Sequence, residues 1–351
     1  MPVVQAETLR RIGHQLFEAA GCDPADARVV THHLVESNLF GHDSHGVIRY
    51  PEYMDAIRTG RFQAKAQPRV VRDHPSCAVV DAAGALGQVG AAFATRLAMD
   101  KASRQGVAAV ALRNTSHVGR VGAYPLMVGR AGMIGQAFVN GGRFGNQIAP
   151  FGGIDARLTT DPLAFAAPRR DAEPIFLDMT TSVAAEGKVR VASYAGKQVP
   201  EGWLIDHHGR PTTDPDSFRA TPKGAILPLG GIASHKGYGM SLMVELLAGT
   251  LSGQGCCVGE SEMVSNGMLL AVHRIDHFID PEDYYQEVEA LIRYVRSSPP
   301  APGFKEILLP GEPELRSARR REAHGIDLDD KTWSLIGADL ERFGLPVPPA
   351  G

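Results

Sequence analysis

Two histidines in unusual local sequences are the side chains in this chain best suited to acid–base chemistry. His45 lies in the segment Gly-His-Asp-Ser-His-Gly, and His117 lies in Ser-His-Val-Gly-Arg-Val-Gly. Imidazole has an unperturbed pKa of about 6.5, so it can give or take a proton near neutral pH. Both histidines are expected where a loop meets a helix, next to glycines that leave room for a ligand. They could act as an acid–base pair, or each could hydrogen-bond its own turn.

Arg49 follows His45 by four residues, a spacing that on a helix would place both side chains on one face. A guanidinium can hold a carboxylate through two hydrogen bonds while an imidazole faces the oxygen on the neighbouring carbon. Together these side chains would suit a 2-oxo or 2-hydroxy acid. Arg49 could instead form a surface ion pair with Glu52 or Asp55.

His42, His45 and His117 could alternatively be metal ligands, with Asp43 nearby. A His-x-x-His pair without a companion glutamate or a cysteine cluster is a weak signal for a metal site. Arg49 would also be an unusual neighbour for a cation. We therefore expect no metal, and a metal-dependent hydrolase that uses these three histidines is the alternative from a different class of enzyme.

The usual dinucleotide-binding fingerprint, Gly-x-Gly-x-x-Gly after a strand, is absent, so the sequence does not support a Rossmann domain. Residues 119–122, 159–162 and 178–182 could nevertheless bind phosphate through backbone amides and hydroxyls, or form ordinary turns. Lys236 stands at the start of an apolar helix, where its charge opposes the helix dipole. Binding of an anion would offset that cost, and a solvated lysine is the simpler alternative.

The periodicity of the apolar residues predicts the elements that must position these side chains. The first 60 residues are typical of three helices, and the tail is helical again and is expected to pack on them. Between these ends, short β-branched runs alternate with alanine-rich helices such as 88–104. Residues 236–251 and 282–296 are expected to form packed amphipathic helices.

This pattern predicts two structural units. Residues 1–67 and 313–351 form a helical domain, and residues 68–312 form an α/β domain that would bind a cofactor. A chain of 351 residues is longer than one core usually serves, at roughly 100 to 200 residues per domain.

The composition is that of an ordinary globular protein, with 44% hydrophobic and 21% charged residues. Against 39 Asp and Glu stand 36 Lys and Arg, and a net charge of −3 gives no overall attraction to nucleic acid or to an anionic membrane. No apolar run reaches the roughly 20 residues of a membrane span. The four cysteines form no Cys-x-x-Cys pair and the first residues are polar, so we expect a cytoplasmic protein without nucleic-acid or membrane partners.

Seven short motifs follow one another between residues 41 and 312, within a resemblance that extends from about residue 5 to residue 345. In order they are G-H-D-S-H-G with Arg49, S-H-V-G-R-V-G, I-F-L-D-M-T-T-S, G-K at 187–188, L-P-L-G-G, H-K-G-Y-G and L-P-G-E. This series resembles the malate/L-lactate dehydrogenase-like family of NAD(P)-dependent oxidoreductases, in particular its hydroxycarboxylate dehydrogenase branch. The resemblance implies an α/β fold of the α+β kind, with a non-Rossmann cofactor domain built on a mixed, largely antiparallel sheet. It also implies a helical domain formed by both chain ends, and a homodimer.

The resemblance further implies a cofactor, NAD or NADP, and the residues that would contact it. These are His45, Gly119, Arg120, Val121, Phe176, Leu177, Asp178, Met179, Thr180, His235, Lys236, Asn266, Gly311 and Glu312. Hydride would pass between the nicotinamide and C2 of a 2-hydroxy or 2-oxo acid, while His117 or His45 carries the proton of the oxygen and Arg49 holds the carboxylate. Reduction of a cyclic 2-imino acid at the same site is the alternative.

One position departs from the family pattern. Where relatives usually have Gly-Thr-Asn-Pro, this chain has Thr-Thr-Asp-Pro at 159–162, which replaces a neutral amide by a carboxylate near the expected substrate. A negative charge there would disfavour a dianionic substrate unless Arg143 or Arg120 offsets it. Asp161 could also accept a hydrogen bond from a cationic or hydroxylated substrate. We therefore predict that Asp161 contacts the substrate, together with Arg49.

Overall fold

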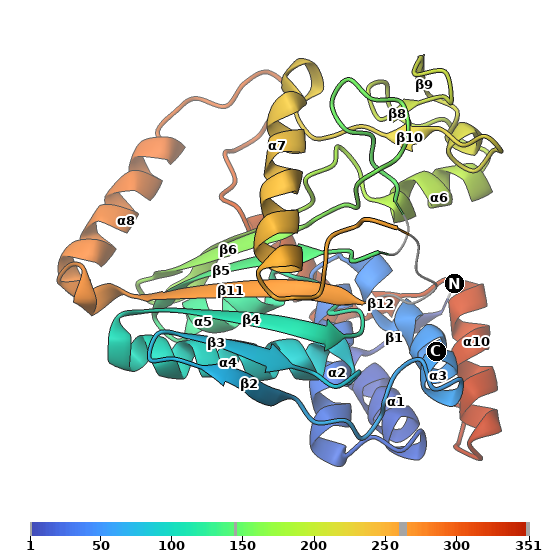
Figure 1. The fold of residues 1–351 in the computed structure, drawn as a ribbon, viewed down its shortest axis with the longest axis horizontal. Helices are drawn as coiled ribbons and strands as arrows, with labels where there is room; N and C mark the ends of the chain where they lie inside the picture. The colour runs from blue at the N-terminus through green and yellow to red at the C-terminus, as the bar shows by residue number, and fades with distance from the viewer. Residues whose placement is uncertain (1, 144–145, 260–264, 349–351) are drawn as a thin grey trace.

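A seven-stranded sheet is the centre of the fold (Figure 1). The computed structural model describes residues 2–143, 146–259 and 265–348. The strands are β2 (Arg69–Asp73), β3 (Cys77–Asp81), β4 (Val107–Thr115), β5 (Met133–Asn140), β6 (Leu163–Arg169), β7 (Ala172–Met179) and β11 (Asn266–Arg274). They lie in the order β2-β3-β4-β11-β5-β6-β7, in which β3 and β4 are parallel and the other neighbours are antiparallel. The prediction of a mixed, largely antiparallel sheet is confirmed.

Helices pack on both faces of this sheet. α4 (Gly87–Gln105) connects β3 to β4 and packs beside α5 (Ala123–Arg130) on one face, while α7 (His235–Val244) crosses the other (Figure 1). Strand residues alternate between the two cores: Val139 belongs to the buried cluster under α4 and α5, and its neighbour Phe138 packs with Val244 of α7. Because β11 inserts between β4 and β5 in antiparallel pairing, the sheet differs from the all-parallel sheet of a Rossmann domain.

Both ends of the chain contribute helices to one core beside the sheet. These helices are α1 (Ala6–Ala19), α2 (Pro24–Leu39), α3 (Tyr50–Arg58), α9 (Glu312–His324) and α10 (Asp330–Arg342). Leu9 and Leu340 belong to the same buried cluster, and β1 (Val3–Val4) pairs with β12 (Ile326–Asp327). The three N-terminal helices and the packing of the tail on them are as predicted. The division into two domains stays a prediction, since this cluster also includes Leu86 and Phe176 of the sheet unit.

The segment 236–251 buries less of its apolar side chains than its sequence predicts. Its α-helix ends at Val244, and residues 245–250 continue as a π-helix. A π-helix has more residues per turn, so side chains spaced for an α-helix drift away from a common face. Val244 is buried, whereas Met243 and Leu251 are 54% and 61% exposed. The prediction of one continuous packed face is therefore wrong for this segment.

α8 (Pro281–Arg296) also differs from the packed helix that its periodicity predicts. Ile292 is buried, but Leu291 and Tyr294 are 60% and 78% exposed. The helix stands at the edge of the molecule and contacts β6, and no described element covers the rest of its apolar face (Figure 1). No helix within the described ranges combines the length and apolarity needed to cross a bilayer.

A small lobe lies beside α7, at the upper right of Figure 1. It contains α6 (Glu186–Tyr194) and a sheet of β8 (Leu204–Ile205), β9 (Pro211–Thr212) and β10 (Ala225–Ile226). The Leu229 amide donates to the Thr181 carbonyl at 2.9 Å, which connects the lobe to the segment that follows β7. A Cβ added to Gly187 would lie 3.7 Å from the Ser44 Cβ, so the first turn of α6 reaches the loop between α2 and α3.

Candidate active site

The structure brings His45 and His117 together. His45 ends a short 3₁₀ turn between α2 and α3, and His117 follows the end of β4. Their rings stack with centroids 5.5 Å apart and an angle of 27° between the planes. Both side chains are partly exposed. Two imidazoles from distant parts of the chain therefore meet where the helical unit joins the sheet.

The loop that carries His45 and Arg49 is not the continuous helix that their spacing suggested. It consists of two 3₁₀ turns separated at Gly46. Arg49 still reaches back to this loop, because its Nε donates to the Ser44 carbonyl at 2.8 Å. Its Nη1 also donates to Glu52 Oε2 at 2.5 Å, so the ion pair considered as an alternative forms as well. The guanidinium is thus oriented next to the histidine pair.

The shape of this loop depends on Asn38, a buried residue of α2 that the sequence did not single out. Its Oδ1 accepts from the Val47 amide at 2.7 Å, and its Nδ2 donates to Asp43 Oδ1 at 2.6 Å. A Cβ at Gly46 would collide with the Asn38 side chain, so glycine is required there. An asparagine near the end of an amphipathic helix gives no sequence signal for this role.

Two buried polar residues form a hydrogen-bond chain that ends at Nδ1 of His117. Its Nδ1 lies 2.7 Å from the Tyr53 hydroxyl, and Gln88 Nε2 donates to the same hydroxyl at 3.0 Å. Asn266 fixes the adjacent backbone, because its Oδ1 accepts from the Val118 amide at 3.0 Å. The sequence did not point to Tyr53 or Gln88, since both occur in helices whose other residues form core. With Nδ1 engaged, Nε2 is the nitrogen of His117 that remains for a ligand.

Both imidazoles have pKa values far below the usual range. Burial lowers the pKa of His45 to about 3, and the charge of Arg49 adds to the effect. The pKa of His117 also lies well below its usual value, through burial first and then through Arg49 and His45. Both rings are therefore neutral at pH 7. An anion bound by Arg49 would offset the guanidinium charge and raise both pKa values, so the site suits a substrate that carries a carboxylate.

The predicted cofactor segment 119–121 packs against α2. The Arg120 amide donates to His33 Nε2 at 2.9 Å, and a Cβ at Gly119 would collide with the same ring. The Arg120 side chain is 1% exposed and pairs with Glu36 at 2.7 Å. Its Nε and Nη1 have no hydrogen-bond partner among the described residues. Arg120 thus faces the protein interior, and Val121 is buried beside it.

The predicted contacts at the end of β7 and before α9 lie side by side. The Phe176 amide donates to the Pro310 carbonyl at 3.3 Å, and a Cβ at Gly311 would collide with the Phe176 ring. Asp178 Oδ2 accepts from the Gly122 amide at 2.7 Å. These contacts gather three of the predicted segments, those around 120, 177 and 311, at one end of the sheet.

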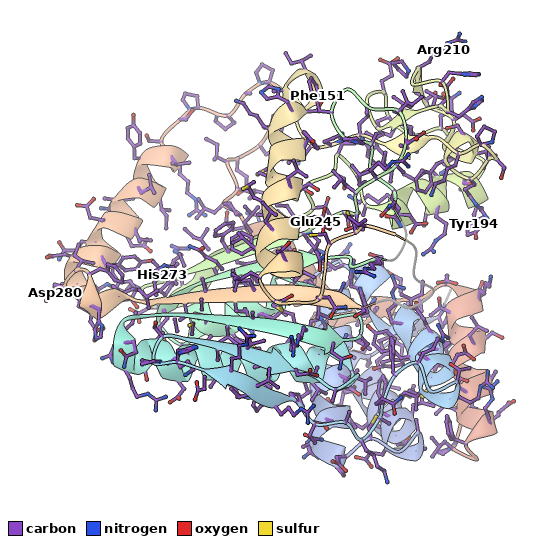
Figure 2. The ribbon with its side chains drawn as sticks, in the orientation of Figure 1. Phe151, Tyr194, Arg210, Glu245, His273 and Asp280 are labelled. Atoms are coloured by element: carbon purple, nitrogen blue, oxygen red, sulfur yellow. The ribbon has the colours of Figure 1, made fainter. Side chains whose placement is uncertain are left out.

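The remaining predicted cofactor residues are more exposed. Leu177 is 38% exposed, Met179 and Thr180 are partly exposed, and Glu312 forms an ion pair with Arg296. His235 and Lys236 are exposed in the first turn of α7. Figure 2 labels Phe151 at this outer end of α7, and its ring packs against His235 with centroids 5.7 Å apart.

Asp161 is fully enclosed by protein. Its backbone is in the left-handed region, with φ 37°. Its Oδ2 accepts from Ser241 at 2.5 Å, and its Oδ1 accepts from the Thr159 hydroxyl. Burial, followed by the charge of Glu245, raises the pKa of Asp161 to about 7. Both carboxyl oxygens are thus occupied by protein groups, so the predicted contact with a substrate remains a prediction that this geometry does not favour.

The described residues contain no group of three or more His, Cys, Asp or Glu side chains arranged to hold a metal ion. His42 Nε2 instead lies 3.8 Å from Glu314 Oε1 of α9. The hydrolase alternative based on His42, His45 and His117 therefore finds no support in the arrangement of these side chains.

Comparisons with known proteins agree with the geometry. A family model described as malate/L-lactate dehydrogenase matches residues 4–336. Hydroxycarboxylate dehydrogenase B of Escherichia coli (strain K12) is 36% identical over 346 residues, which cover 97% of this chain and 94% of the relative. A malate dehydrogenase structure from Entamoeba histolytica superposes with a TM-score of 0.91 at 28% identity, covering 99% of both chains. A Δ1-piperideine-2-carboxylate reductase from Pseudomonas syringae pvar. tomato gives a TM-score of 0.80 at 31% identity, covering 98% and 99%.

The relatives match this chain in sequence and in fold over nearly its entire length. Similarity of this extent includes the helical unit, the mixed sheet and the loop that carries His45. This protein is an oxidoreductase that belongs to the malate/L-lactate dehydrogenase family.

Proposed function

We propose that this protein is an NAD(P)-dependent 2-hydroxyacid dehydrogenase that also acts in the reverse direction as a 2-oxoacid reductase. The observation that carries this proposal is the stacked pair of His45 and His117, with Arg49 bonded to the same loop. Family membership supports the class of reaction, and the geometry supports the roles of these three side chains.

The residues present fit a nicotinamide dinucleotide. The first N–H groups of α7 lack partners within the helix, and exposed Lys236 adds a positive charge, so this end of α7 suits a phosphate. Leu177 and Met179 offer apolar surface at the end of β7, and Thr180 offers a hydroxyl. We propose the fourteen positions from His45 to Glu312 named above as the contacts. Bound there, NAD or NADP would accept or supply the hydride.

The protein's own groups would bind and orient the acid and move one proton. Arg49 holds the substrate carboxylate, and its bond to the Ser44 carbonyl fixes the direction of the guanidinium. This orientation directs the oxygen on C2 toward the two imidazoles. In oxidation, Nε2 of His117 or His45 takes the proton of the C2 hydroxyl, and in reduction it returns that proton to the C2 oxygen. Both histidines are retained as candidates.

Steady-state assays test this proposal directly. Purified protein is mixed with NADH or NADPH and a panel of pyruvate, phenylpyruvate, oxaloacetate, glyoxylate and cyclic imino acids, and nicotinamide absorbance is followed. We expect turnover of at least one 2-oxo acid and a preference for one of the two cofactors. If both reduced cofactors bind, as seen by enhanced fluorescence, but no compound in a broad panel is reduced, the protein binds its ligand without catalysis and the proposal fails.

The second candidate function is reduction of a cyclic 2-imino acid. A structural neighbour named as a Δ1-piperideine-2-carboxylate reductase supports it. Such a substrate also carries a carboxylate for Arg49, and it presents a nitrogen rather than an oxygen to the histidines. The same panel distinguishes the two functions by which compound has the highest kcat/KM.

We also propose a homodimer. Support comes from the apolar side chains that the single chain leaves exposed on α8, including Leu291 and Tyr294, and from Met243 of α7. Exposed apolar side chains of this size are a feature of interfaces between subunits. Sedimentation equilibrium should give twice the mass of one chain, and a monomer at all concentrations would refute the dimer.

A further inference from the structure

A buried hydrogen-bond chain runs from α4 through α3 to the ring of His117. Gln88 Nε2 donates to the Tyr53 hydroxyl at 3.0 Å, and that hydroxyl lies 2.7 Å from His117 Nδ1. The side chains of Tyr53 and Gln88 are both 0% exposed, so no water competes for these bonds. The chain connects the sheet unit and the helical unit to the imidazole that the proposed function uses.

The direction of these hydrogen bonds determines which nitrogen of His117 carries a hydrogen. Burial raises the pKa of Tyr53, so its hydroxyl keeps its single proton. When the Gln88 amide donates to the Tyr53 oxygen, that proton is directed at His117 Nδ1. Nδ1 is then an acceptor, and the neutral ring carries its hydrogen on Nε2.

The chain can also run in the opposite direction. A ring with its hydrogen on Nε2 cannot take a substrate proton there, so a base acting at Nε2 needs the other tautomer, with the hydrogen on Nδ1. The Tyr53 oxygen must then accept, and the Tyr53 hydrogen must turn to another acceptor. Gln88 Oε1 is buried and has no hydrogen-bond partner in the present orientation. Rotation of the Gln88 amide would bring this oxygen to the Tyr53 hydroxyl. The unused acceptor thus has a role whenever Nδ1 carries a hydrogen, in the neutral base as well as in the imidazolium.

We propose that Tyr53 and Gln88 are positioning residues that hold His117 by Nδ1. With Gln88 Oε1 accepting from Tyr53 and the Tyr53 oxygen accepting from Nδ1–H, the neutral ring presents an unprotonated Nε2 to the substrate hydroxyl. The proposal rests on the proposed dehydrogenase function. In oxidation, bound NAD(P)+ would accept the hydride released from C2, and the unprotonated Nε2 would take the hydroxyl proton, which makes the ring an imidazolium. Nδ1 keeps its own hydrogen throughout and donates it to Tyr53, and Tyr53 donates to Gln88 Oε1. Reduction runs these transfers backwards.

His45 has no comparable support. Its Nδ1 lies 3.0 Å from the hydroxyl of Ser44, and Ser44 is exposed, so water can replace this bond. The charged and titratable groups that face His117 are Arg49, His45, His33 and Tyr53. Of these, Tyr53 is the one that bonds its ring directly.

Tyr50 provides a matched control for a Tyr53 variant. Both tyrosines belong to α3, both are 0% exposed, and both rings meet Phe17 edge-on, with centroids 5.7 Å and 6.5 Å away. The Tyr50 hydroxyl, however, donates to the Leu9 carbonyl at 3.1 Å. Tyr50→Phe and Tyr53→Phe each remove one buried hydroxyl, but only Tyr53→Phe removes the hydrogen bond to His117.

The first measurement does not need activity. Nitrogen NMR of the substrate-free protein, labelled at histidine, should show His117 with a protonated Nδ1 and an unprotonated Nε2. In Tyr53→Phe the two tautomers should mix, and in Tyr50→Phe the wild-type pattern should persist. An unchanged His117 pattern in Tyr53→Phe would overturn the proposal, whether or not the protein turns over any acid.

The second measurement uses kinetics on the substrate that the panel identifies. We expect Tyr53→Phe to lower kcat about tenfold or more and to shift the pH profile of kcat, while KM changes less than about twofold because Arg49 is untouched. Tyr50→Phe should keep kcat. Gln88→Glu, which can only accept when ionised, should move the pH profile toward a higher pKa of His117. Equal losses of kcat in Tyr50→Phe and Tyr53→Phe would refute the positioning role of Tyr53. Absence of turnover in the wild type would instead refute the proposed function.

Discussion

The histidine pair and the Asp161–Glu245 pair each bring together two titratable side chains from distant segments, but one is open and the other is closed. His45 and His117 are partly exposed, and the protein bonds only one nitrogen of each ring in a way that leaves Nε2 for a ligand. Asp161 and Glu245 are 0% and 3% exposed, beneath the inner end of α7, where Figure 2 labels Glu245. An open cluster can perform chemistry on a ligand, whereas a closed one acts on stability.

The two clusters also respond to pH in opposite directions. The folded protein keeps its histidines neutral, while the unfolded chain protonates them near pH 6.5, so stability is lost as the pH falls below that value. Asp161 in the folded protein keeps its proton up to about pH 7, while the unfolded chain releases it near 3.8. Stability from this group is therefore lost as the pH rises between those two values.

This difference changes the interpretation of the aspartate at position 161. Below pH 7 a protonated Asp161 has the shape and the neutral charge of the asparagine that the family pattern leads one to expect. Its proton can be shared with Glu245, whose Oε1 has no other hydrogen-bond partner among the described residues. The substitution would then leave substrate preference unchanged in acid and add a second buried negative charge only at higher pH.

Replacing a histidine of the open cluster should give the largest effect. His117→Gln should lower kcat by roughly 100- to 10,000-fold if His117 is the proton carrier, because the general acid–base group is lost. The melting temperature should change little, since the ring is partly exposed. Measuring kcat for His45→Gln in parallel identifies the carrier as the residue with the larger loss. If both variants keep more than half of the wild-type kcat, the cluster is not the catalytic centre.

Arg49→Lys should have the next largest effect on activity. Lysine keeps the positive charge but cannot form two parallel bonds to a carboxylate or reach the Ser44 carbonyl in the same way. We expect KM for the acid to rise about tenfold, which corresponds to about 1.4 kcal/mol of binding. Methyl esters of the same acids serve as controls, because they lack the charge that Arg49 binds. An equal rise in KM for acid and ester would show that Arg49 acts by shaping the loop.

Asp161→Asn should stabilise the protein at pH 8 by about 4 kcal/mol, because it removes a carboxyl group whose pKa is raised from 3.8 to about 7 in the folded protein. At pH 3, where Asp161 holds its proton in the folded protein and largely also in the unfolded chain, the two proteins should unfold at nearly the same denaturant concentration. The free energy of unfolding at both pH values is the measurement. A pH-independent difference would mean that the two carboxyl groups do not share a proton. A changed ratio of kcat/KM for pyruvate and oxaloacetate would revive the predicted substrate contact.

The sequence predicts elements and motifs better than it predicts which side chains meet. His45, His117 and Arg49 stand out by their local sequences, and helical periodicity finds the helices at both ends. The bond between Tyr53 and His117 joins residues 64 positions apart, and both partners of Tyr53 lie on other elements. Periodicity cannot encode such a contact, because a core tyrosine and a positioning tyrosine occupy the same face of a helix.

The contacts of Asp161 in the closed cluster could not be predicted from the sequence, for a different reason. Glu245 begins the π-helical segment, which changes the face that each later residue occupies, and a pattern counted at 3.6 residues per turn does not register this change. Ser241 lies before this segment, in the α-helical part of α7, and it meets Asp161 across 80 positions of sequence. The sequence identified Asp161 as unusual, but it did not indicate that Ser241 and Glu245, on another element, would be its neighbours.

Removing Glu52 should have the smallest effect, and it tests how open the histidine cluster is. Glu52 pairs with Arg49 at 2.5 Å, and its side chain is 43% exposed. A partly exposed ion pair contributes at most about 1 kcal/mol. A substrate carboxylate competes with Glu52 for the same guanidinium, so Glu52→Gln should lower KM for the acid by less than about fivefold. The effect should shrink at high salt, where such pairs are screened. A rise in KM would mean that Glu52 orients Arg49 for the substrate, and the pair would then belong to the binding machinery.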